Sequence, residues 1–151
     1  LLKKYEIPVI YETVNSLPRR RWEDFDTPFT GPVKLYEAGV KYCISMGTGG
    51  ASSHRNTPYE ASKAASYGLP KDEAIKSVTL YAAEVLGIAD KAGSLEKGKD
   101  ATLMVTDGDP LEITTQVAQV YIQGKKIDMS DRHKVLYDKY KEKYRQLGKI
   151  K

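Results

Sequence analysis

The sequence predicts an α/β fold in which a parallel strand–helix–strand unit is followed by short helices, a small β-structure and a final helix. Three observations predict it. Two strand-like segments flank a short helical pattern in the first third of the chain. An Ala-rich helical region follows, and from Gly93 onward the apolar pattern changes to a period of two. A strand, a helix and a strand in this order are expected to form a parallel pair.

The first strand is expected over residues 6–14 (EIPVIYETV), which are rich in Val, Ile, Tyr and Thr. Residues 15–31 contain prolines, a run of three arginines and several acidic residues without periodicity, which is typical of a long loop. A short helix is expected over residues 32–38, ending at Gly39.

The second strand of the unit is the run VKYCIS at residues 40–45, whose apolar content predicts burial. Its cysteine, Cys43, is the single cysteine of the chain and is expected to be a small buried side chain. One cysteine cannot form an internal disulfide, so the redox compartment stays open.

Three helices are expected next, over residues 58–67, 70–78 and 80–86. Thr57 is a candidate cap for the first of them, and Glu60 completes a capping box. The Ala-rich composition of this region predicts close packing.

Strands are expected over residues 101–106 and 117–122, with a turn at 107–110 between them. After Gly124 the chain is expected to turn into a short strand at 125–127. These segments predict a small antiparallel sheet.

The tail predicts an amphipathic helix, with Ser130 as its candidate cap. Its apolar residues recur at helical spacing and form one stripe, which predicts docking: Leu136, Tyr140, Tyr144 and Leu147. Residues 131–151 hold eight Lys and Arg against three Asp and Glu, so they carry the whole excess of the net charge of +4. A basic helix is more often a solvated face than a phosphate-binding surface, and no nucleic-acid partner is expected. The mean hydropathy of -0.51 and the lack of a long apolar run predict no membrane span.

Several segments resemble a known family. Residues 93–103 (GSLEKGKDATL) closely resemble the GSLExGKDADL signature of the amidohydrolase superfamily. Residues 80–88 (LYAAEVLGI) resemble its T-x-N-P-A-x-x-L-G-I helix, with Tyr-Ala in place of Asn-Pro, and residues 55–61 (RNTPYEA) are similar to its RNLPYEA element. The tail at 136–144 (LYDKYKEKY) is similar to one branch of imidazolonepropionase-like proteins.

The resemblance implies the C-terminal portion of an imidazolonepropionase-like amidohydrolase with a partial (β/α)8 TIM-type barrel. Residues 1–88 would supply its last two strand/helix units, 89–128 the strands of a small accessory β-sandwich, and 129–151 a C-terminal amphipathic helix. A barrel of this type has eight strands and about 250 residues, so one copy of the chain is not expected to close. Its open edges predict self-association or pairing with a complementary N-terminal barrel segment.

The resemblance also implies a catalytic site after the last barrel strand. Thr48 lies where the family usually has Asp, and a hydroxyl donates a hydrogen bond but is no general base without an activating partner. His54 is a candidate catalytic residue, with a loop or hydrogen-bonding role as the alternative. Arg55 and Asn56 are candidates for binding a small-molecule substrate, or for fixing the loop. No metal ligand is assigned; a divalent metal such as Zn is expected only for the complete family fold.

Two functions stay open at this point. The first is a C-terminal fragment of a hydrolase that acts on non-peptide or cyclic C–N bonds and is inactive alone. The alternative is a non-catalytic structural or interaction subunit derived from an amidohydrolase.

Overall fold

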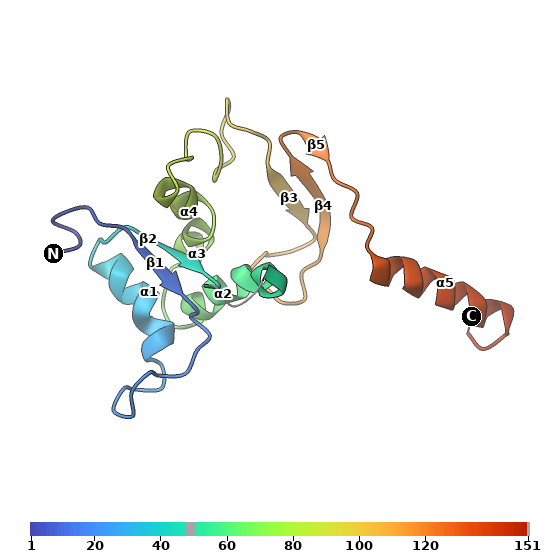
Figure 1. Cartoon of the computed structure of the whole chain (residues 1–151), viewed down its shortest axis with the longest axis horizontal. Coiled ribbons are helices and arrows are strands. Elements are labelled where there is room, and N and C mark those ends of the chain that lie inside the picture. The colour runs from blue at the N-terminus through green and yellow to red at the C-terminus, as the bar shows by residue number, and fades with distance from the viewer. Residues whose placement is uncertain (48–50, 151) are drawn as a thin grey trace.

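The computed structural model describes residues 1–47 and 51–150, and it has the mixed α/β character that the sequence predicts. In chain order the elements are β1 (Val9–Glu12), α1 (Thr27–Glu37), β2 (Tyr42–Ser45), the 3₁₀ helix η1 (Ala51–Asn56), α2 (Thr57–Ser66), α3 (Lys71–Ser77), α4 (Leu80–Val85), β3 (Leu103–Thr106), β4 (Val117–Ile122), β5 (Lys125–Lys126) and α5 (Arg132–Gln146). Figure 1 shows β1 and β2 among the first four α-helices, the small sheet to one side and α5 extending away from both.

Strands β1 and β2 pair in parallel, so the predicted parallel pair is confirmed. Ile10 lies opposite Cys43, and Glu12 lies opposite Ser45. Strand β1 is shorter than expected because Glu6 and Thr13, on either side of it, both have a φ of 52°, which lies outside the β region.

The two faces of this strand pair have different surroundings. Tyr42 and Ile44 of β2 belong to the core, together with alanines of the neighbouring helices that are fully buried. Their small side chains let α2 and α3 approach closely, as the Ala-rich sequence predicts. On the other face Cys43 is buried, as expected, whereas Ile10 remains 54% exposed. This second face is therefore partly open.

Helix α1 begins at Thr27, five residues before the predicted start. Pro32 thus lies inside the helix and not at its start, and a proline there leaves the carbonyl four residues earlier without its usual N–H donor. Here that carbonyl belongs to Pro28, and the Tyr11 hydroxyl donates to it at 2.9 Å. A contact from β1, distant in the sequence, thus replaces the missing hydrogen bond.

The cap expected at the start of α5 is wrong. Asp131, not Ser130, accepts the backbone N–H of Lys134 at the start of α5, whereas Ser130 donates its hydroxyl hydrogen to Asp128. The end of α1 is as expected: Gly39 has a φ of 62°, which glycine adopts without strain, and Val40 N–H donates to the Leu35 carbonyl in a Schellman-type closure.

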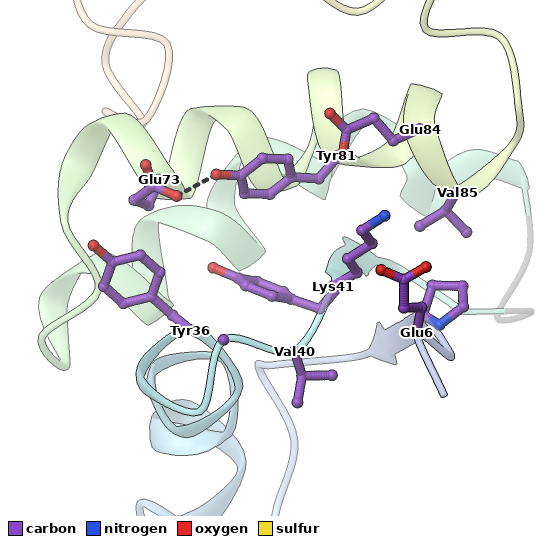
Figure 2. Close-up of a pocket in the computed structure, with 11 residues that line it drawn as sticks. Glu6, Tyr36, Val40, Lys41, Glu73, Tyr81, Glu84 and Val85 are labelled. Atoms are coloured by element: carbon purple, nitrogen blue, oxygen red, sulfur yellow. Dashed lines mark hydrogen bonds between the residues drawn. The ribbon is translucent and has the colours of Figure 1, made fainter. Parts of the chain in front are cut away.

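A pocket of about 600 Å³ opens at the amino-terminal ends of the strand pair. Residues preceding β1 and β2 form its floor, and side chains of α1, α3 and α4 surround it (Figure 2). It lies at the opposite end of the strands from η1, which follows the carboxyl end of β2.

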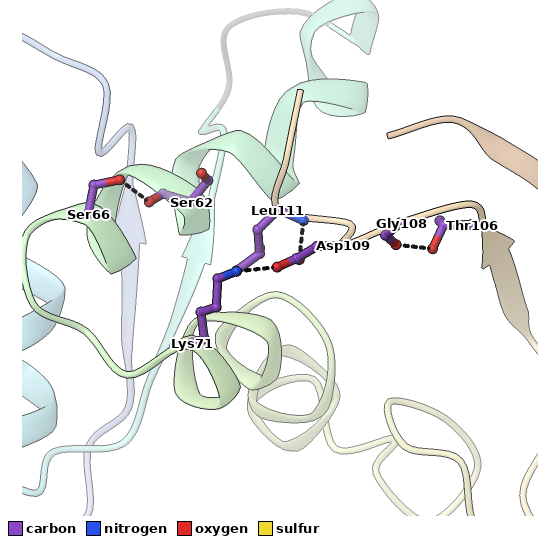
Figure 3. Close-up of polar contacts among 7 residues, drawn as sticks. All are labelled: Ser62, Ser66, Lys71, Thr106, Gly108, Asp109 and Leu111. Atoms are coloured by element: carbon purple, nitrogen blue, oxygen red, sulfur yellow. Dashed lines mark hydrogen bonds and ion pairs between the residues drawn. The ribbon is translucent and has the colours of Figure 1, made fainter. Parts of the chain in front are cut away.

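The predicted small sheet is present, with strand order β3-β4-β5 and antiparallel pairing throughout. The loop after β3 fastens this sheet to the helices (Figure 3). Asp109 forms an ion pair with Lys71 of α3 and accepts the backbone N–H of Leu111 at 2.9 Å. Leu111 is buried in the same core cluster as Ile44.

Helix α5 buries no residue, so the predicted docking of its apolar stripe is not met within the described part of the chain. Leu136, Tyr140, Tyr144 and Leu147 are all exposed. Among residues 1–47 and 51–150, the search for a helix with the length and apolar character of a bilayer span finds none.

A substitution at Gly31 tests how α1 docks on β1. An added Cβ would lie 2.1 Å from the Tyr11 hydroxyl oxygen, which is closer than atoms can approach. Gly→Ala in a helix normally stabilises by about 0.5–1 kcal/mol, but we expect Gly31→Ala to lower the free energy of unfolding by about 1–3 kcal/mol through overpacking. Urea denaturation followed by circular dichroism measures it. In a Tyr11→Ala background the same change should be neutral or stabilising, and an equal loss in both backgrounds would contradict the contact.

Candidate active site

The carboxyl ends of β1 and β2 bring together two polar side chains and a tight turn. Glu12 and Ser45 lie opposite each other in the strand register. Gly47 N–H donates to the Ser45 Oγ at 3.1 Å, and Gly47 has a φ of 67°, which favours glycine. A Cβ on Gly47 would lie 3.2 Å from a Glu12 carboxylate oxygen. The Glu12 carboxylate therefore borders the turn after β2.

Three of the sequence-predicted site residues lie on η1. His54 and Arg55 are exposed, and Asn56 is partly buried at the entrance to α2. The Thr57 hydroxyl donates to the His54 carbonyl at 2.7 Å, which fixes the backbone between η1 and α2. An imidazole, a guanidinium and an amide thus follow one another just after the carboxyl end of β2. Thr48 lies outside the described residues.

Glu60 is a buried carboxylate, only 4% exposed, at the start of α2. The expected capping box is wrong, because the Thr57 hydroxyl turns back to His54 and Glu60 turns to the loop after β1. The Asn15 backbone N–H donates to one Glu60 oxygen at 2.8 Å, and the Asn15 side-chain amide donates to the other at 3.3 Å. Glu60 thereby joins the loop after β1 to the helix that follows η1.

Cys43 lies on the same face as Ile10 but does not offer a nucleophile. Burial raises the pKa of the Cys43 thiol above its usual range, so the thiol stays protonated at neutral pH. Its place in β2 is that of a small core side chain.

Comparisons with known proteins identify the family. The model of the Amidohydrolase family matches residues 30–127. The chain is 35% identical over 98 residues to amidohydrolase tasK of Hapsidospora irregularis, which covers 65% of this chain and 10% of that protein. It is 38% identical over 79 residues to the imidazolonepropionase of Mesorhizobium japonicum, covering 50% of this chain and 19% of the relative.

The chain belongs to the amidohydrolase family. A solved structure agrees: the amidohydrolase from Thermotoga maritima superposes with a TM-score of 0.69 and 29% identity, over 84% of this chain and 33% of that one. The predicted kinship with imidazolonepropionase-like amidohydrolases is thus confirmed. The chain spans 10–19% of the length of these two curated relatives.

The described residues of this amidohydrolase chain do not fit a metal centre by themselves. In residues 1–47 and 51–150, no group of three or more His, Cys, Asp or Glu side chains could hold an ion, whereas a bound zinc wants three or four protein ligands. We therefore assign no metal-dependent step to these side chains.

Sequence reasoning missed the two carboxylates of the candidate site in this amidohydrolase. Glu12 closes an apolar strand, and its place beside Gly47 depends on the register of two strands far apart in the sequence. The sequence pattern indicates Glu60 only as part of a local capping box. Both are acidic residues next to a strand or helix boundary. Such residues are too common for that position alone to identify a functional carboxylate.

Replacing Glu60 tests its role as the link to the loop after β1. Glu60→Ala should lower the free energy of unfolding by about 2–3 kcal/mol, because hydrogen bonds to a carboxylate contribute about 1.5–3 kcal/mol and the Asn15 N–H loses its partner. Urea denaturation measures this loss, and hydrogen exchange should show faster exchange of the Asn15 amide. Asn15→Ala, which removes only the bond at 3.3 Å, is the matched control and should cost about 1 kcal/mol or less. Equal losses in the two variants would contradict the buried link.

Proposed function

We propose that this chain is the C-terminal portion of an amidohydrolase that hydrolyses a C–N bond of a cyclic or other non-peptide small molecule. The observation that carries the proposal is the parallel pair β1–β2, with Glu12 and the η1 residues at its carboxyl end. In (β/α)8 enzymes the active site lies at that end of the strands, in the loops that follow them. Membership of the amidohydrolase family supports the reaction class.

The architecture proposed with this function is a partial (β/α)8 barrel. Residues 1–88 form its last two strand/helix units, 89–128 the accessory β-structure and 129–151 the C-terminal helix. The face of β1 that carries Ile10 and Glu12 would then point into the barrel. Ile10 is 54% exposed, which suits a side chain whose packing partners come from other strands. A complementary N-terminal barrel segment would supply those strands.

In this proposal each polar side chain of the site has its own role in hydrolysis. Glu12 accepts the proton of the attacking water, which a carboxylate can do where the Thr48 hydroxyl cannot. Thr48 donates a hydrogen bond to the oxygen on which negative charge develops. His54 donates a proton to the leaving nitrogen, and Arg55 and Asn56 hold a polar group of the substrate. The divalent metal expected for the complete family fold, such as Zn, would need ligands from outside the described residues.

One observation favours the second function, a non-catalytic structural or interaction subunit. Helix α5 exposes its whole apolar stripe, and such a surface is typical of a segment that binds another polypeptide. Metal uptake separates the two functions, because the hydrolase needs a metal in the completed barrel and the structural subunit does not.

Activity should appear only when the barrel is completed. We expect the chain mixed with a complementary N-terminal segment, with Zn²⁺ added, to hydrolyse hydantoin-like compounds or N-acyl amino acids, and the chain alone to be inactive. In the mixture Glu12→Gln should lower kcat by about 10²-fold or more, since general acid–base catalysis contributes about 10²–10⁴. Glu37→Gln, an exposed carboxylate at the end of α1, is the matched control and should keep full activity.

Steady-state kinetics and the metal content of the purified mixture provide the measurement. Full activity in Glu12→Gln would remove Glu12 from the mechanism. A mixture that binds no metal and turns over no substrate would favour the structural subunit instead.

The chain alone should self-associate. The described part of the chain pairs β1 and β2 only with each other, so each strand has one edge with unpaired N–H and C=O groups. We expect size-exclusion chromatography with light scattering to report dimers or larger species, and the complementary segment to dissociate them. Ile10→Lys, which places a charge on the open face, should weaken the association. A stable monomer at high concentration would contradict the open edges.

A further inference from the structure

The pocket at the amino-terminal ends of β1 and β2 has a distinctive chemical lining. Apart from Lys41, its polar side chains are three carboxylates and three tyrosines from five parts of the fold: Glu6, Glu73, Glu84, Tyr36, Tyr42 and Tyr81. Valines and a proline complete the wall. In Figure 2 the labelled carboxylates of α3 and α4 and the Glu6 side chain surround the same hollow. A volume of about 600 Å³ is in the range of small-molecule sites.

The Tyr42 hydroxyl is the observation that points to a ligand. Tyr42 is 3% exposed, and its hydroxyl has no hydrogen-bond partner among the groups that the structure describes. Burial, and then the Glu73 carboxylate and Tyr36, raise the pKa of Tyr42 to about 12, so it is a neutral phenol at neutral pH. Because both neighbours line the pocket, the hydroxyl end lies among pocket residues. A buried polar group of this kind normally has a partner.

The charge of the residues that line the pocket indicates whether the ligand is a cation or an anion. The lining residues include three carboxylates and one ammonium, that of Lys41, and the Lys3 ammonium lies close to the lining residue Gly39, where an added Cβ would be 2.9 Å from its nitrogen. Glu73 is already engaged, since it accepts the Tyr81 hydroxyl at 2.5 Å and pairs with Lys76 at 2.9 Å. Glu6 and Glu84 are exposed and remain available. Negative charge combined with aromatic rings favours a cation, and an ammonium or guanidinium also interacts with tyrosine faces.

We propose that this pocket binds an organic cation, an ammonium or guanidinium group on a short apolar chain. The head group donates a hydrogen bond to the Tyr42 oxygen, the Glu6 and Glu84 carboxylates add negative charge to the lining, and the apolar chain lies against Val40 and Val85. Tyr36 is 41% exposed, and in this proposal its side chain rotates to give the head group access to the Tyr42 oxygen. The cation comes either from a free amine or from a Lys or Arg side chain of a segment pairing with the open edge of β2.

Titration of the full chain with n-butylammonium and n-butylguanidinium, followed by NMR of the tyrosine ring protons, tests the proposal. We expect saturable shifts at Tyr36, Tyr42 and Tyr81, and none with n-butyrate. Tyr42→Phe should weaken binding by about tenfold or more, as expected for loss of a hydrogen bond to a charged group. Tyr137→Phe on exposed α5 is the matched control and should bind normally.

The Lys41→Gln variant tests whether the ligand is a cation or an anion. It should strengthen binding of the cations, because it removes the competing ammonium, whereas an anion site would be weakened. Absence of saturable shifts with either cation, or equal binding of n-butyrate, would overturn the proposal. Binding by the chain alone but not after addition of a complementary barrel segment identifies a side chain of that segment as the cation, and binding in both identifies a free amine. These outcomes do not depend on hydrolytic activity, so the proposed function can fail separately.

Discussion

The parallel alignment of β1 with β2 is the constraint on which the rest of the structure depends. A parallel pair requires a crossover, and α1 supplies it by lying against β1 through the contact of Tyr11 with Gly31 and Pro28. The same alignment gathers the two carboxyl ends at one edge, where Glu12 borders the Gly47 turn. It gathers the two amino ends at the other edge, where the tyrosine and glutamate pocket opens. The two candidate sites are thus two ends of one strand pair.

Local patterns in the sequence predict the elements whose stability is local. Strand β4 was expected over the residues it occupies, and the parallel pair follows from the order of two apolar strands around a helix. The patterns fail where a contact between distant segments decides. The start of α1 depends on the Tyr11 hydroxyl reaching the Pro28 carbonyl, and the side-chain partner of Glu60 is Asn15. Neither partner can be recognised from residues near the element itself.

The candidate site likewise combines residues whose place the local sequence predicts with residues whose place depends on distant contacts. Chain order alone places His54, Arg55 and Asn56 after β2, because a loop that follows a strand begins at its carboxyl end. The place of Glu12 needs the strand register, which a single sequence does not give. The sequence does not indicate a binding role for Tyr42, because a tyrosine in an apolar strand is normally a packing residue. Its role is suggested only by the structure, in which its buried hydroxyl has no hydrogen-bond partner among the described groups.

The residues that reveal the family are not those that would carry the chemistry. Gly93 packs so closely on α4 that an added Cβ would lie 2.6 Å from the Ala83 Cβ, and Asp109 holds the small sheet to α3. These contacts join the small sheet and the segment before it to the helices, and they take no part in the proposed chemistry. A match over residues 30–127 therefore establishes ancestry and fold. In the proposed function, catalysis depends on Glu12, which lies outside the matched segment, and on the few polar residues at the carboxyl ends of the strands.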